Sequence, residues 1–225
     1  DEAMAALEAA RAEQSKNLME ADRRIGDVLF SAGENEAAAE VYQRVIDGGA
    51  DVDQIVAKRR VEALLRQGKW DEAVAGVEAI EKKQGRDLQT LLLRVDAASG
   101  KGDTALARRL VDEAVSIAPT DPLPFVRRAQ LGFGDPTQTQ AVVRDLDQAK
   151  ALRPTLPMPR RMLADIYARE GRVSDAITQL NDVIKFNPLN DQLRYEMIMD
   201  MIRLGRMEDA KTAARLAVEQ RKELE

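Results

Sequence analysis

The side chains available for chemistry in this sequence are carboxylates, amines and guanidinium groups, because its 225 residues include neither histidine nor cysteine. That absence excludes histidine-dependent triads, thiol nucleophiles and histidine or cysteine metal clusters. Adjacent carboxylates occur at Asp71-Glu72 and Asp112-Glu113, but acid–base catalysis needs a shielded pocket that separates their pKa values. These pairs are typical of a solvated helix surface. We therefore expect no enzymatic activity, no cofactor and no metal, with the scaffold region of a larger enzyme as the remaining alternative.

The segment Gly100-Lys101-Gly102 could suggest a phosphate site. A phosphate-binding loop needs a strand before it, a helix after it, and a serine or threonine directly following the lysine. The sequence has none of these here. We therefore expect a simple turn.

Paired basic residues are a further chemical feature. They stand at Arg23-Arg24, Lys58-Arg59, Arg127-Arg128 and Arg160-Arg161. Because arginine binds a carboxylate through two parallel hydrogen bonds, one interpretation is a surface that holds an acidic segment.

A simpler interpretation is that these cations pair within their own helices. Residues four apart face each other on a helix, and such ion pairs contribute roughly 0.2–0.5 kcal/mol. The pairs at this spacing are Arg23 with Asp27, Lys58 with Glu62, and Arg161 with Asp165. The sequence leaves both interpretations open.

The elements that would position these groups follow a repeat. Glycines recur at intervals of 34 or 35 residues, at Gly33, Gly68, Gly102, Gly171 and Gly205, with Thr137 in the one slot that lacks glycine. A small residue follows each slot by five places, at Ala38, Ala73, Ala107, Val142, Ala176 and Ala210. A period of this length indicates stacked helical repeats.

The stretch 157–190 shows one repeat most clearly. Its first half carries an apolar face that ends at Gly171, formed by Met162, Leu163, Ala164, Ile166 and Tyr167. Its second half carries another, formed by Ala176, Leu180 and Val183, which ends before Pro188. This spacing predicts two amphipathic helices joined by a glycine turn. The small alanines should lie where the two backbones approach most closely.

This pattern resembles the tetratricopeptide repeat, a 34-residue helix–turn–helix unit. The residues that carry the resemblance are Leu163-Ala164, Tyr167, Gly171, Ala176, Leu180 and Pro188, together with Gln67 to Ala73 around another turn. The tryptophan that opens the family's first helix is absent throughout, and Arg60 and Arg94 replace a usual leucine. The resemblance covers nearly the whole chain. It implies an all-α fold, namely a right-handed α-solenoid of antiparallel helix pairs.

The repeat register predicts the boundaries of the units. We expect a partial repeat or capping helix at residues 1–18 and then six units of one continuous solenoid, at 19–53, 54–87, 88–122, 123–156, 157–190 and 191–225. Asp1-Glu2-Ala3 recurs as Asp71-Glu72-Ala73, and Leu7 follows at the matching spacing. This match favours a segment of a longer array that starts in the second helix of a repeat. A capping helix is the alternative.

Two local features add expectations. Trp70, the single tryptophan, directly follows a turn and should wedge between neighbouring helices. In unit 123–156, Gly132, Gly134 and Asp135-Pro136 should end the first helix early, with Asp135 capping the next helix.

The resemblance also implies a binding surface, because tetratricopeptide arrays hold an extended peptide or a partner helix in the groove lined by their first helices. The side chains expected there are Arg23, Arg24, Lys58, Arg59, Leu92, Leu93, Arg127, Arg128, Leu131, Arg161, Met162, Tyr195 and Met199, with Met158 and Asp165 in the same register. The expected function is a protein-interaction scaffold for an unidentified protein or peptide. The alternative is a spacer or self-assembly module, joined through open solenoid ends, within a larger protein. Tetratricopeptide proteins of bacterial envelope polysaccharide export look broadly similar.

Other partner classes are disfavoured. The net charge is -5, and the expected groove offers one aromatic side chain, Tyr195, whereas single-stranded nucleic acid is held by basic grooves with stacked aromatics. No apolar run approaches the roughly 20 residues that span a membrane. Cytoplasmic and periplasmic locations are both compatible with the sequence.

Overall fold

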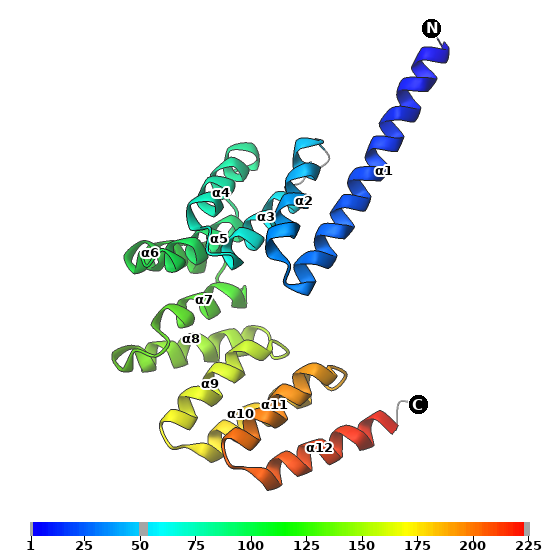
Figure 1. Ribbon diagram of the computed structural model, residues 1–225. Coiled ribbons are helices and arrows are strands. Elements are labelled where there is room, and N and C mark those ends of the chain that lie inside the picture. Colours follow the sequence, from blue (N-terminus) through cyan, green and yellow to red (C-terminus); the bar gives the residue numbers. More distant parts are fainter. Residues whose placement is uncertain (1, 50–53, 223–225) are drawn as a thin grey trace. The chain divides into compact units, whose positions relative to one another are not determined.

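A computed structural model describes the backbone of residues 2–49 and 54–222 and the side chains of Gln14 and of residues 17–49 and 54–219. Within these ranges the chain is helical (Figure 1). The helices are α1 (Glu2–Ala32), α2 (Asn35–Asp47), α3 (Ile55–Arg66), α4 (Trp70–Gln84), α5 (Leu88–Gly100), α6 (Thr104–Ile117), α7 (Pro122–Gly132), the 3-10 helix η1 (Pro136–Gln138), α8 (Thr139–Leu152), α9 (Pro157–Arg169), α10 (Val173–Phe186), α11 (Asp191–Arg203) and α12 (Met207–Lys222).

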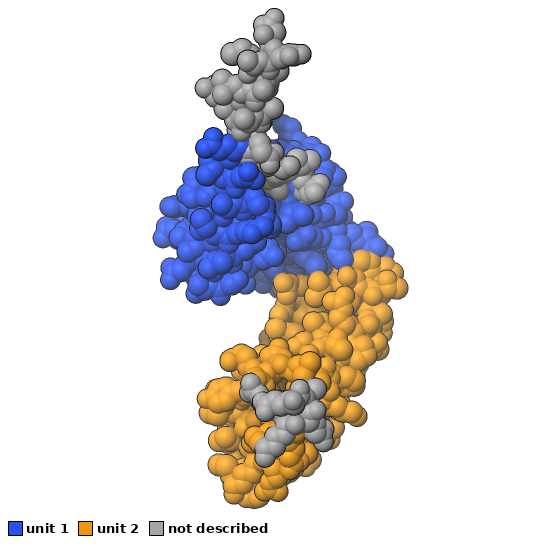
Figure 2. Space-filling model, turned by 90° about the vertical axis from the view of Figure 1, so that its right-hand side faces the viewer, with its two compact units in different colours: residues 1–117 blue, residues 118–225 orange. Residues whose placement is uncertain are grey.

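The helices pack in consecutive pairs, which confirms the predicted all-α fold of helix pairs. They form two compact units, coloured separately in Figure 2. Unit 1 comprises residues 1–117, with α1 to α6, and unit 2 comprises residues 118–225, with α7 to α12.

The glycine turns explain why the helices pair. Gly33, Gly68, Gly102, Gly171 and Gly205 all have φ between 72° and 86°, a left-handed conformation that glycine adopts without a steric cost. In each turn the residue after the glycine donates its N–H back into the preceding helix, as Arg172 does to the carbonyl of Tyr167 at 2.8 Å. This is the Schellman closure of a helix end, and it reverses the chain within two or three residues.

The fourth turn departs from the predicted register. α7 ends at Gly132, as expected, and Asp135 caps η1 by accepting the N–H of Thr137 at 2.9 Å. The left-handed residue is Gly134, with φ of 91°, rather than the residue at the predicted slot, Thr137. A 3-10 turn fills the space between Gly134 and α8, which is why threonine is tolerated there.

The core follows the predicted alternation of small and large residues. The six positions five places after each turn slot, from Ala38 to Ala210, are all buried. Tyr42, Val77 and Leu180 fill the larger positions and are at most 2% exposed. Trp70 packs on α5, since a Cβ added to Gly100 would lie 2.5 Å from its ring. The contact of this ring with α5 agrees with the predicted packing role, and the wedge between two helices stays a prediction.

The N-terminal helix differs from the expected units. α1 runs unbroken from Glu2 to Ala32, so the expected boundary after residue 18 lies inside a continuous helix. The side chains of Ala3, Leu7 and Ala10 lie outside the described part of the chain. Their match to a second-helix register therefore rests on the sequence alone.

Candidate functional site

Several residues expected on the groove of unit 1 are instead part of its interior. Lys58 is 8% exposed, and its ammonium lies 2.6 Å from the carboxylate of Asp87, not against Glu62. Leu92 and Leu93 are 8% and 4% exposed. Lys58, Leu92 and Leu93 are therefore mostly buried within unit 1, and their predicted contact with a partner stays a prediction.

The arginines of α1 pair along their own helix, as the simpler interpretation predicted. Arg23 lies 2.7 Å from Glu20 and 3.5 Å from Asp27, and Arg24 lies 3.1 Å from Glu20. Hydrogen bonds from both arginines lower the pKa of Glu20 to about 2. Arg59 is exposed and lies 4.0 Å from Asp27. These three cations thus share the two carboxylates of Glu20 and Asp27.

In unit 2, Arg128 is also a structural residue. Its guanidinium forms a two-pronged contact with buried Asp145, at 2.9 Å and 2.6 Å. Arg127 is partly buried and donates to the amide oxygen of Gln130 at 3.0 Å, while Leu131 is partly buried. Arg128 thus holds Asp145 through two of its guanidinium nitrogens.

Arg160 likewise holds the fold together. It is 5% exposed and donates to the carbonyl of Pro154 at 2.5 Å. Burial lowers its pKa, and nearby Asp182 opposes that shift. Arg194, one repeat later, donates to the carbonyl of Pro188 in the same way. These two arginines fasten the loop that enters each first helix.

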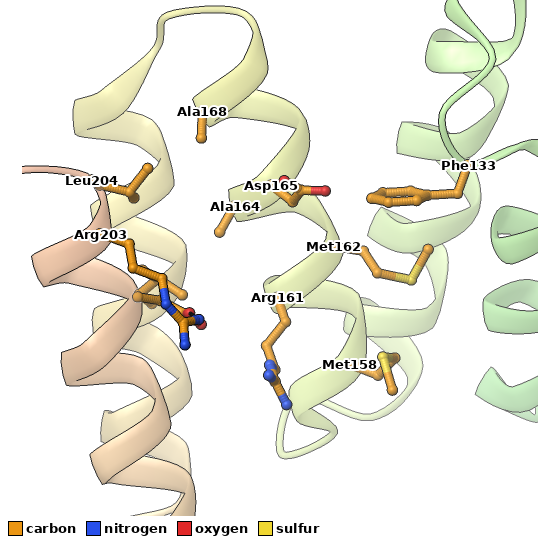
Figure 3. Close-up of a pocket in the computed structure, with 11 residues that line it drawn as sticks. Phe133, Met158, Arg161, Met162, Ala164, Asp165, Ala168, Arg203 and Leu204 are labelled. Atoms are coloured by element: carbon orange, nitrogen blue, oxygen red, sulfur yellow. Dashed lines mark hydrogen bonds and ion pairs between the residues drawn. The ribbon is translucent and has the colours of Figure 1, made fainter.

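Unit 2 has an open groove of about 540 Å³ on α9. Its lining is Phe133, Met158, Arg161, Met162, Ala164, Asp165, Ala168, Leu180, Asp200, Arg203 and Leu204. In Figure 3, Met158 and Met162 lie on the side of α9 that faces Phe133, and Ala164 and Ala168 lie on the side that faces Leu204. We call this set the α9 groove.

The groove has this shape because the α9 register alternates large and small side chains. Met158 and Met162 are four residues apart, as are Ala164 and Ala168, so each pair shares one face of the helix. Because the alanine side chains are small, they leave open space between α9 and the neighbouring α11. Methionine is flexible and polarizable and adapts to varied apolar partners. Met158, with 42% of its surface exposed, is the most accessible apolar group in the lining.

The charged residues of the groove are paired across and along its helices. Arg161 lies 3.1 Å from Glu196 of α11, rather than against Asp165. Asp165 lies 2.7 Å from Arg169, whose guanidinium stands 5.2 Å from the ring of Phe133. Arg203 lies 2.7 Å from Asp200. The rim thus carries both signs of charge beside an apolar base.

The remaining expected residues lie on α11. Tyr195 is 60% exposed and Met199 is partly buried, while Met197 and Met201 are fully buried. None of these four lines the α9 groove. The sequence missed Phe133, Arg203 and Leu204. Phe133 was missed because it lies just after a helix end and has the sequence pattern of a turn. Arg203 and Leu204 were missed because they lie at the C-terminal end of α11, outside the helix face that was expected to line the groove.

Two further features concern membrane-spanning helices and metal sites. Among the residues that the structure describes, no helix is both long and apolar enough to span a membrane. Over that same part of the chain, no group of three or more aspartates and glutamates is placed to hold a metal ion.

Comparison with known proteins identifies the family. The tetratricopeptide repeat profile matches residues 1–52 and 59–122, which is just over half of the chain. Cellulose synthase operon protein C of Xanthomonas axonopodis pv. citri (strain 306) is 29% identical over 179 residues. That match covers 74% of this chain but only 10% of the relative, so the chain spans about a tenth of its length.

Solved structures share the fold. A thermophilic tetratricopeptide protein of Thermus thermophilus aligns with a TM-score of 0.67 and 20% identity, over 82% of this chain and 99% of its own. A tetratricopeptide repeat protein from Parabacteroides merdae ATCC 43184 aligns with a TM-score of 0.53 and 14% identity, over 92% and 80%. Given the profile match and the paired helices, this chain belongs to the tetratricopeptide repeat family.

Proposed function

We propose that this protein is an interaction scaffold and that the α9 groove holds a peptide segment of its partner. Proteins of this repeat family generally act through protein contacts, and the groove is lined largely by first helices of pairs. The single observation that carries the proposal is the exposed apolar surface of Met158 in a concavity of about 540 Å³ that Phe133 and Met162 also line.

The ligand best suited to this groove is an extended or helical segment with apolar side chains. The base of the groove presents thioether, phenyl and methyl groups, which gain from burial at roughly 25 cal/mol per Å². An acidic segment is the narrower version of the proposal, gripped by Arg161 and Arg203. Because these arginines already contact Glu196 and Asp200, an acidic ligand would have to displace those carboxylates.

The experiment is a selection of peptides from a random display library on the intact chain, followed by affinity measurements on variants. Met158→Ala should weaken the selected peptides at least about tenfold, which corresponds to about 1.4 kcal/mol. Met207→Ala is the matched control, because Met207 is similarly exposed, at 48%, and lies outside the groove. Equal losses in both variants, or no loss in either, would reject the α9 groove.

Arg161→Gln separates the two versions of the ligand. If the segment is acidic, this variant should weaken binding and remove much of its salt dependence. If the segment is apolar, affinity should change little with either the variant or salt.

A second candidate function is a spacer or self-assembly module within a longer protein. The similarity to cellulose synthase operon protein C favours it, because this chain matches only a tenth of that relative. On this account the α9 groove is idle, and the protein associates through the ends of its helix array. Concentration-dependent mass in sedimentation, together with a failed peptide selection, would favour this candidate.

A further inference from the structure

One wall of the α9 groove is a side chain on irregular backbone. Phe133 lines the groove but follows the end of α7, with φ of -67° and ψ of 127°, and Gly134 after it has φ of 91°. The ring is partly buried and packs on a core cluster that includes Met162 and Leu163. Because Phe133 lies outside the helices, the place of its ring in the groove depends on side-chain contacts.

Arg169, at the end of α9, lies against this irregular turn. Its guanidinium carbon is 5.2 Å from the centroid of the Phe133 ring, within the roughly 6 Å over which a cation is attracted to an aromatic face. A Cβ added to Gly134 would lie 4.0 Å from Nη1 of the same guanidinium. Arg169 therefore connects the last turn of α9 to the turn that follows α7.

Asp165 in turn holds Arg169. The two residues stand four apart on α9, where side chains meet on a helix surface, and their charged groups lie 2.7 Å apart. Figure 3 shows the carboxylate of Asp165 on the side of α9 that faces Phe133. A guanidinium is planar and stacks on aromatic faces while it binds a carboxylate. A chain of contacts thus runs from Asp165 through Arg169 to the ring.

Unit 1 contains the same pairing in a closed form. Arg66 stands 36 residues after Phe30, as Arg169 does after Phe133. Its guanidinium carbon lies 3.8 Å from the centroid of the Phe30 ring, and it donates to the Phe30 carbonyl at 3.3 Å. Phe30 is 6% exposed and belongs to the core. In unit 2 the corresponding ring is only partly buried, so it is held in a similar way but borders a groove.

Residue spacing alone does not produce this contact. Tyr167 and Arg203 are also 36 residues apart. However, Arg172 lies over the Tyr167 ring, at 4.2 Å, and Arg203 instead pairs with Asp200, three residues before it.

The position of the neighbouring carboxylate differs between these cases. In the two pairs that form, it stands four residues before the arginine, as Glu62 before Arg66 and Asp165 before Arg169. The contact at Phe133 therefore depends on a specific acidic neighbour as well as on the repeat.

We propose that Arg169, held by Asp165, is a positioning residue that fixes the Phe133 ring as a wall of the α9 groove. The consequence for binding rests on the proposed function: an apolar side chain of the ligand packs against a ring that is already in place. Such preorganisation strengthens binding because less freedom is lost when the ligand arrives. Arg169 is not part of the groove lining, so it acts through Phe133.

Fluorine NMR of the free protein, labelled with 4-fluorophenylalanine, tests the positioning without any ligand. The chain has four phenylalanines, and the signal lost in Phe133→Leu identifies the ring in question. In Arg169→Gln this signal should move toward that of the free amino acid, whereas Arg169→Lys, which keeps the cation, should stay closer to wild type. Arg206→Gln is the control, because Arg206 pairs with Asp209 at 2.6 Å outside the groove. An unchanged Phe133 signal in Arg169→Gln would overturn the proposal.

Peptide affinity tests the consequence separately. For peptides selected on the α9 groove, Arg169→Gln should weaken binding several-fold in the wild-type background and have no effect in the Phe133→Leu background, because the two residues act through one contact. Equal losses in both backgrounds would show that Arg169 acts on the ligand without Phe133 and would reject the positioning role. If selection yields no peptide, the proposed function fails, and the fluorine signal alone decides whether Arg169 places the ring.

Discussion

The ammonium of Lys58, on α3, lies 2.6 Å from the carboxylate of Asp87, which caps α5. Asp87 also forms a reciprocal pair of hydrogen bonds with Thr90 at the start of α5, at 2.8 Å and 3.0 Å. One carboxylate therefore neutralises a buried cation of one helix and closes the N-terminus of the helix that packs beside it.

Replacing Asp87 by alanine should destabilise the protein by about 1–3 kcal/mol, because the variant loses the cap and leaves the Lys58 ammonium without this carboxylate. Urea unfolding measures the loss. Asp71→Ala is the control: its ion pair with Lys101 is exposed, and such pairs contribute at most about 1 kcal/mol. Equal effects in the two variants would contradict the structural role of Asp87.

The Asp87 contribution should also depend on pH. Burial raises the pKa of this carboxyl, but hydrogen bonds from Lys58 and Thr90 outweigh it, so the pKa is below the ordinary 3.8. A depressed carboxyl pKa stabilises the fold above the unfolded value and loses that effect as the pH falls through the folded value. The difference between wild type and Asp87→Ala should therefore shrink below about pH 4, as measured by urea unfolding across that range.

Glu62 should show the opposite sign. Burial raises its pKa above the ordinary 4.5, although Arg59 and Arg66 oppose the shift. The folded state then binds a proton more readily than the unfolded chain, so stability falls as the pH rises through that interval. Glu62→Gln should be more stable than wild type at pH 7, with the advantage vanishing below about pH 4. A constant difference between the two proteins over this range would reject the assignment.

A side chain larger than hydrogen at Gly26 should disturb the contact between α1 and α2. A Cβ there would lie 2.5 Å and 2.8 Å from ring atoms of Tyr42, a fully buried side chain whose hydroxyl donates to Asp27 at 2.8 Å. Gly26→Ala should destabilise the protein by about 1–3 kcal/mol, despite the higher helix propensity of alanine. In a double-mutant cycle measured by thermal unfolding, Gly26→Ala should cost less stability in the Tyr42→Leu background than in the wild type. Strict additivity would mean that the ring is not the obstacle.

Arg128 and Arg127 are adjacent in sequence but should respond differently to substitution. Arg128→Met leaves Asp145 buried without its two-pronged partner and should cost about 2–4 kcal/mol. Arg127→Met, whose side chain donates to Gln130, should cost less than about 1 kcal/mol. Chemical denaturation distinguishes the two. For the same reason, a binding test that reverses the charge of Arg128 would disturb the fold, so Arg161 is the better choice.

The sequence predicted the features that depend on local constraints. The turn glycines were evident because a left-handed φ is a requirement of single residues, and Ala38 and Ala176 were evident because the repeat brings the same small size to the same contact. The irregular turn at Gly134 was predicted in part. The early end of α7 was predicted, but the 3-10 turn that moves the left-handed residue from the slot at Thr137 to Gly134 was not.

The sequence predicted the pairing of Arg23 with Asp27 within one helix, but it did not predict the ion pairs between helices. Spacing within a helix suggested Lys58 with Glu62 and Arg161 with Asp165, but the observed partners, Asp87 and Glu196, are on neighbouring helices. Their proximity depends on how helices pack, which a one-dimensional pattern does not contain. Phe133 was missed for a related reason, since a residue between two helices has no face that periodicity can assign.

The most direct test of the α9 groove is the methyl NMR spectrum of methionine-labelled protein, recorded with and without a selected peptide. The eight methionines include Met158 and Met162 in the groove and Met207 outside it. A peptide bound in the α9 groove should shift the Met158 and Met162 signals and leave those of Met207 and of Met19, in unit 1, unchanged. Shifts at Met207 or Met19 with none at Met158 and Met162 would place the binding surface elsewhere and contradict this prediction.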